Sequence, residues 1–107
     1  MKRGFITKIR NLLKKVEFNK DSIEIIIEIL KIADAKKLDP FHFDLQNYIL
    51  KPLEEKLPYT FNKMRKMIDA DIRENWDKYK DVYKECGFDT KPTTKGLISC
   101  LILKLRD

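Results

Sequence analysis

The sequence predicts an all-α fold, a compact orthogonal bundle of about six helices. The 107 residues include only three glycines and four prolines, so long segments run without helix breakers. Apolar residues recur at helical spacing, and the isoleucine-rich segment 23–32 has no second strand-like run to pair with. Hydrophobic residues make up 43% and charged residues 37%, which is typical of a globular chain. We therefore expect one helical domain spanning residues 1–107.

The first two predicted helices differ in how much of their surface is apolar. The first, over residues 5–16, is apolar on one side and basic on the other; we expect it to pack on the chain's own core rather than on a membrane surface. A polar break follows, in which Asp21 and Glu24 resemble a capping box. The second helix is apolar around most of its girth, which predicts that it is the central buried helix.

Three prolines predict the boundaries of the next elements. Asp39 followed by Pro40 is typical of a helix start, with an N-cap and a proline in the first turn. Pro52 disfavours helix in the residue before it and opens a helix well, so we expect a short helix over residues 52–57. A tight turn at residues 58–60 follows, and Thr60 is the expected N-cap of the next helix.

Three further apolar stripes complete the prediction. The helix over residues 60–76 carries a core-facing stripe of Phe61, Met64, Ile68, Ile72 and Trp76. A shorter stripe at residues 79–86 ends at Gly87, a residue suited to the left-handed position after a helix. The last helix begins near Thr93.

Residues 52–76 have the layout of a helix-turn-helix, in which a short helix, a turn and a longer helix follow one another. In this motif the second helix enters the major groove N-terminus first. Its first turns carry long polar side chains, at Asn62, Lys63, Arg65 and Lys66. The net charge of +6 suits a polyanion such as nucleic acid, anionic lipid or an acidic protein. An ordinary helical hairpin with a solvated charged face shows the same pattern, so pattern alone leaves both interpretations open.

Two blocks resemble the C-terminal DNA-binding domain of the stage-zero sporulation response regulator, the master regulator of sporulation in endospore-forming bacteria. The blocks are PLEEKLPYTFNKMRKMIDADIRENW (52–76) and KPTTKGLISCLILKLR (91–106), with a weaker match at FITKIRNLL (5–13). With small length changes the resemblance covers nearly the whole chain. It rests on the order of the blocks and the register of their residues rather than on a strict sequence signature.

The resemblance implies a six-helix domain that binds a short DNA box in tandem or inverted copies and contacts RNA polymerase. The positions that match base-contacting ones are Lys63, Arg65 and Lys66. The positions expected near phosphates are Thr60, Asn62, Lys91, Thr93 and Thr94. Arg65 stands where the family has a glutamate, and Lys63 replaces an arginine. Because arginine prefers guanine whereas glutamate accepts from cytosine, a different box is expected.

The family joins this domain to a phosphorylatable receiver domain, for which this chain has no room. It is therefore expected to be either a stand-alone relative or an excised domain. It would bind double-stranded DNA without phosphorylation of its own, with a homodimer forming on tandem sites. The alternative is a basic helical protein-interaction module, whose acidic partner is an RNA polymerase subunit or a sigma factor.

The sequence gives little support to other functional classes. His42 has no nucleophile or carboxylate pair beside it, so no enzyme activity and no cofactor are expected. Cys86 and Cys100 lack the partners of a zinc site, and each is expected to be a free thiol in the helical core. The most apolar stretch, residues 23–33, is too short and too charged to span a bilayer, and residues 1–4 lack a cleavable-signal pattern. A cytoplasmic protein is therefore expected.

Overall fold

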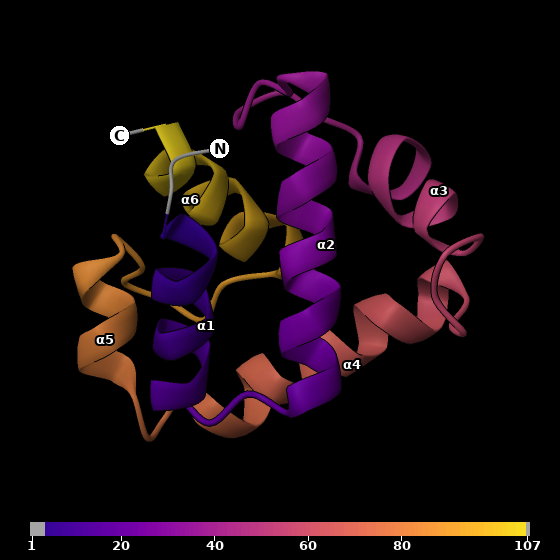
Figure 1. The fold of residues 1–107 in the computed structure, drawn as a ribbon. Coiled ribbons are helices and arrows are strands. Elements are labelled where there is room, and N and C mark those ends of the chain that lie inside the picture. The colour runs from indigo at the N-terminus through magenta and orange to yellow at the C-terminus, as the bar shows by residue number, and fades with distance from the viewer. Residues whose placement is uncertain (1–3, 107) are drawn as a thin grey trace.

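The isoleucine-rich helix α2 (Lys20–Lys36) lies at the centre of the molecule. Ile26, Ile29 and Leu30 have no exposed surface. The helix contacts α1, α4, α6 and the π-helical segment η1, and Figure 1 shows it between α1 and α6 on one side and α3 on the other. The prediction that this helix is the buried centre of the fold is confirmed, because a helix that is apolar around most of its girth needs partners on several sides.

The computed structural model describes residues 4–106, so residues 1–3 and 107 of the predicted domain lie outside the described part. Across the described residues the structure contains helices and no strand, which confirms the all-α prediction. The elements other than α2 are α1 (Phe5–Lys15), η1 (Gln46–Leu50), α3 (Lys51–Leu53), α4 (Phe61–Asn75), α5 (Lys80–Glu85) and α6 (Thr94–Arg106). The Cα radius of gyration is 12.9 Å, close to the value of about 13 Å expected for a compact domain of about 100 residues. None of the helices in this part of the chain is both long and apolar enough to cross a membrane.

The helix predicted to start at Pro40 begins five residues later, so this prediction is wrong. The Asp39 carboxylate accepts a hydrogen bond from the Phe41 backbone N–H at 2.9 Å, which closes a local turn instead of a helix. The Asp44 carboxylate accepts from the Asn47 N–H at 3.0 Å, and helical structure begins at the next residue. This bond and a second one from the Asn47 side chain lower the pKa of Asp44 below its ordinary value. Asp44 therefore takes the capping role expected of Asp39.

Pro52 does not open a new helix, as the sequence predicted, but lies inside a helix that runs from residue 45 to 53. A proline has no N–H, so the Tyr48 carbonyl four residues earlier receives no helical bond from it. The Lys36 ammonium donates to that carbonyl at 2.8 Å, and the chain widens to π-helical geometry just before the proline. The helix ends at Leu53, and residues 54–60 form the connection to α4 in place of the predicted 52–57 helix and three-residue turn.

Helix α4 buries Met64, Ile68 and Ile72 as predicted, but Trp76 at its C-terminal end is only half-buried. The Trp76 ring meets Tyr83 of α5 edge-on, with ring centroids 5.3 Å apart. The predicted core position of this tryptophan is therefore wrong, because the chain turns away after Asn75 and leaves one side of the ring in solvent.

Trp76→Ala is expected to lower the free energy of unfolding by about 2 kcal/mol, below the ~3–5 kcal/mol of a fully buried aromatic residue. The loss comes from the edge-on ring contact and the buried part of the indole. Urea denaturation followed by circular dichroism measures it. Trp76→Phe, which keeps a ring against Tyr83, should lose less. A cost above about 4 kcal/mol for Trp76→Ala would contradict the half-buried placement.

Candidate nucleic-acid interface

The solvent-facing side of α4 carries the polar side chains that the sequence analysis identified. Lys63, Arg65 and Lys66 are exposed, whereas Met64 and Ile68 on the opposite side have no exposed surface. Asn62 is exposed as well. This separation follows from the helical repeat, because the three- and four-residue steps that align the apolar residues align the basic ones on the other face.

The N-terminal half of α4 presents positive charge, and the next carboxylate along the helix, Asp69, accepts a hydrogen bond from the Thr94 hydroxyl. The ion pairs found among residues 4–106 lie elsewhere, and none of them includes Lys63, Arg65 or Lys66. Asp71 is buried and accepts hydrogen bonds from Asn19. The α4 surface from residue 62 to 66 is therefore cationic.

The start of α6 lies against α4 and adds further polar groups. Thr93 is the N-cap of α6, with its hydroxyl oxygen accepting from the Gly96 N–H at 3.0 Å, and its side chain is exposed. Lys91 is exposed nearby. Thr94, predicted to contact a phosphate, is instead 1% exposed and donates its hydroxyl to the Asp69 carboxylate. Thr94 therefore docks α6 on α4 and is not part of the interface.

A hollow of about 300 Å³ lies between α4 and the start of α6. Arg65, Asp69 and Arg73 of α4 line it together with Lys91 and Thr93 of the connection before α6, so three cations and one carboxylate border one depression. Arg65, Lys91 and Thr93 were predicted from the sequence, whereas Arg73 was not. The signal was present, because Arg73 follows Arg65 by eight residues and so falls near the same face of the helix.

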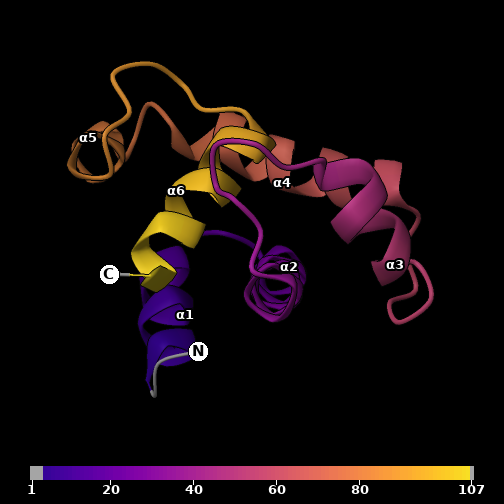
Figure 2. The same cartoon turned by 90° about the horizontal axis from the view of Figure 1, so that it is seen from above.

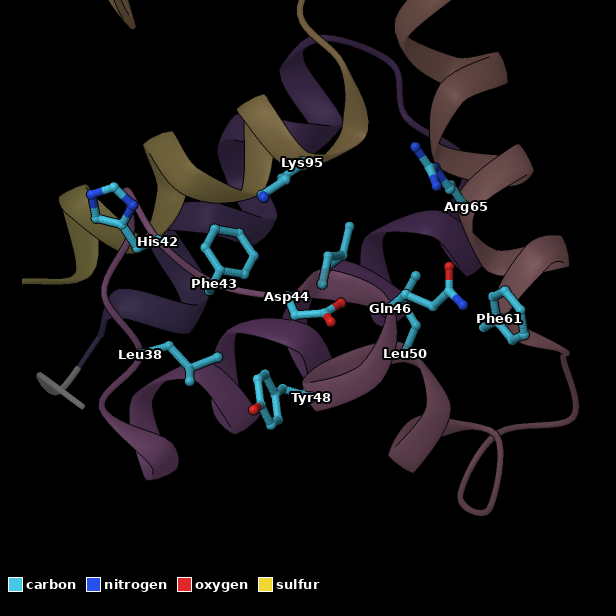
Figure 3. Close-up of a pocket in the computed structure, with 11 residues that line it drawn as sticks. Leu38, His42, Phe43, Asp44, Gln46, Tyr48, Leu50, Phe61, Arg65 and Lys95 are labelled. Carbon is cyan, nitrogen blue, oxygen red and sulfur yellow. The ribbon is translucent and has the colours of Figure 1, made fainter.

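A second, larger hollow of about 440 Å³ lies on the other side of Arg65 (Figure 3). Arg65 reaches it from α4 and Lys95 from α6, and the Lys95 ammonium lies 5.3 Å from the centre of the Phe43 ring. Asp44 and Tyr48 line the opposite wall. Arg65 thus borders both hollows, and the basic surface continues from Lys95 across α4. Lys95 was missed because only the packing of α6 brings it here.

The N-terminus of α4 is not free, contrary to the expectation that it could meet a phosphate directly. Thr60 caps the helix, as predicted, by accepting a hydrogen bond from the Lys63 N–H at 3.2 Å. The Glu54 carboxylate accepts from the Phe61 N–H at 2.6 Å. A carboxylate therefore already occupies the position where the partial positive charge of the helix end would favour an anion.

No group of three or more His, Cys, Asp or Glu side chains among residues 4–106 is arranged to hold a metal ion. His42 is exposed at one edge of the larger hollow, apart from Arg65 and Lys95 in Figure 3. Comparison with known proteins adds no family: no family model, no curated protein and no solved structure matches this chain.

Proposed function

We propose that this chain is a sequence-specific DNA-binding domain of a transcription regulator, which places the first turns of α4 in the major groove. The supporting observation is the cationic, solvent-facing surface of α4 at Lys63, Arg65 and Lys66, backed by buried Met64 and Ile68. The major groove of B-DNA is about 12 Å wide, which admits one α-helix with its side chains. Residues 45–75 would act as the helix-turn-helix.

Within this proposal the cationic residues divide into two roles. Lys63, Arg65 and Lys66 would read base edges, and Arg65 at the middle of the surface has the planar fork that pairs with guanine. Residues at the margins would hold phosphates: Thr60, Asn62, Arg73, Lys91, Thr93 and Lys95. Because phosphate contacts fix register while base contacts carry sequence information, the two sets should have separable effects.

The resemblance to sporulation regulators belongs to the same proposal. It would make this chain a cytoplasmic relative of their DNA-binding domain, pairing with a second copy on tandem sites.

Selection from a pool of randomised duplexes, followed by salt titration of the recovered sites, tests this function. We expect an enriched box of several base pairs and a log–log salt dependence with a slope of about −0.9 per neutralised phosphate. Salt-dependent binding without an enriched box would reduce the proposal to contact with the phosphate backbone. Absence of binding at moderate salt would contradict it altogether.

A protein-interaction module remains the second candidate, and the larger hollow favours it. Tyr48 at its wall is 56% exposed, and the cations Arg65 and Lys95 line the same hollow; Phe41, seven positions earlier in the sequence, is 69% exposed. An acidic partner with apolar side chains, such as a subunit or sigma factor of RNA polymerase, would fit this surface. Tyr48→Ala should weaken such a contact and leave duplex binding unchanged, which separates the two candidates.

Glu54→Gln is expected to tighten duplex binding by about two- to fivefold, since a charge at a helix end contributes about 0.3–1 kcal/mol. The change removes a negative charge beside the N-terminus of α4 and keeps an oxygen that can accept from the Phe61 N–H. Fluorescence anisotropy at fixed salt measures the effect. Glu55→Gln makes the same change in net charge one residue away. An equal gain in both variants would show a general charge effect rather than one at the helix end.

A further inference from the structure

The two cysteines of the chain, fourteen positions apart, meet where the end of α5 packs beside α6. The Cys100 thiol donates to the backbone carbonyl of Cys86, with 3.3 Å between sulfur and oxygen. Cys100 is also the largest influence on the pKa of the Cys86 thiol. Both side chains are half-buried rather than enclosed in the core. The sequence predicted free thiols in a helical core, and the structure has two free thiols that are close together and only half-buried.

The surroundings of the pair favour one thiolate beside one thiol. The hydrogen bond from Cys100 lowers the pKa of Cys86 to about 6, helped by the Lys104 ammonium and opposed by burial and by Glu85. The same hydrogen bond and burial raise the pKa of Cys100. Cys86 is therefore the better nucleophile at neutral pH, and Cys100 holds a proton beside it, an arrangement typical of reactive cysteine pairs.

We propose that Cys86 and Cys100 form a peroxide-reactive dithiol site, in which Cys86 is attacked first and Cys100 resolves it to an intramolecular disulfide. The Cys86 thiolate attacks one oxygen of hydrogen peroxide, the O–O bond breaks, and a sulfenic acid and hydroxide form. The Cys100 sulfur then attacks the Cys86 sulfur, the S–O bond breaks, and water leaves. Overall, two thiols lose two protons and two electrons to peroxide, which becomes two molecules of water.

The disulfide would close a ring that contains the connection between α5 and α6. This connection carries Lys91 and Thr93. A covalent ring of this size restricts the unfolded chain more than the folded one, so the oxidised protein should unfold at a temperature several degrees above the reduced one. Neither cysteine is itself a proposed DNA contact, but the ring would enclose Lys91 and Thr93, which the proposed function places near phosphates.

Treatment of the reduced, full-length protein with stoichiometric hydrogen peroxide tests the proposal. Intact mass should show a monomer that has lost two hydrogens, and peptide mapping should show Cys86 joined to Cys100. In Cys100→Ser, dimedone should trap a sulfenic acid on Cys86. In Cys86→Ser, the Cys100 thiol is mainly protonated at neutral pH. It should therefore react with peroxide at least about tenfold more slowly than the Cys86 thiol does in Cys100→Ser.

Several results would overturn the proposal. One is a wild-type protein that keeps both thiols free while a low-molecular-weight dithiol in the same tube is oxidised. Another is oxidation that joins only two different chains. Equal peroxide reactivity of the two single variants would show that Cys86 is not the first site of attack. Circular dichroism confirms that each variant is folded, and the wild-type mass measurement stands without any variant.

Discussion

Lys63→Glu combined with Lys66→Glu should reduce the affinity for the selected duplex by at least about 100-fold. Each cation that contacts a base contributes about 1–3 kcal/mol, and the two carboxylates would add repulsion from the phosphates. Both side chains are exposed and lie on the surface of α4 that faces away from the core. Folding should therefore be unaffected, and the loss can be measured by fluorescence anisotropy at a fixed salt concentration.

A matched control uses the same change in charge on another helix. Lys14→Glu combined with Lys15→Glu alters two exposed lysines in the last turn of α1 and changes the net charge equally. We expect a much smaller loss there, because charges farther from the duplex than about 10 Å are largely screened at 0.1 M salt. If both double variants lose affinity equally, α4 has no special role and the proposed groove-reading surface is wrong.

Asp71→Ala should lower the free energy of unfolding by about 2–4 kcal/mol, because it removes a buried carboxylate that accepts two hydrogen bonds. Asp71 on α4 is 1% exposed and accepts from both the backbone N–H and the side-chain amide of Asn19, at 3.3 and 2.6 Å. These bonds join the connection between α1 and α2 to α4. Their loss also leaves a cavity in the helix packing. Urea denaturation gives the change directly.

Three comparisons make the stability prediction specific. Asp77→Ala alters an aspartate whose side chain is 86% exposed, and we expect it to change stability by less than about 0.5 kcal/mol. Asp71→Asn keeps one acceptor oxygen and should lose less than Asp71→Ala. A double-mutant cycle with Asn19→Ala should show coupling between the two residues. Additive effects would mean that the bond from the Asn19 side-chain amide contributes nothing to stability, since Asn19→Ala keeps the backbone N–H that also donates to Asp71.

The sequence alone determined the features that depend on the spacing of residues within one helix. The apolar repeat predicted α1, α2, α4 and α6, and it predicted that α2 is buried. The same repeat predicted that Lys63, Arg65 and Lys66 lie together on the exposed side of α4, where the structure has them. These predictions succeed because a helix imposes one angle per residue, so neighbours on its surface can be counted from the sequence.

Residues that are typical of helix boundaries, such as proline and aspartate, predicted those boundaries less reliably. Tertiary contacts can offset the energetic cost of placing such a residue elsewhere in a helix. Pro52 lies inside a helix since the Lys36 ammonium from α2 satisfies the carbonyl that the proline leaves without its helical partner. Asp39 closes a turn while Asp44 caps the helix. A carboxylate two or three residues before an N–H can do either, and the packing of the chain around Phe43 and Leu45 decides between them.

Tertiary structure alone decided which residues from different helices share a surface. It brought Lys95 and Lys91 beside Arg65, turned Thr94 inward to Asp69, placed Glu54 on the first N–H of α4, and joined Cys86 to Cys100. Each of these contacts depends on the packing of α6 or on the path of a connection rather than on helical repeat. Spacing along the chain carries no information about such angles, so it predicted the cationic surface only within α4, and Lys91 and Thr93 were expected near phosphates only from the resemblance.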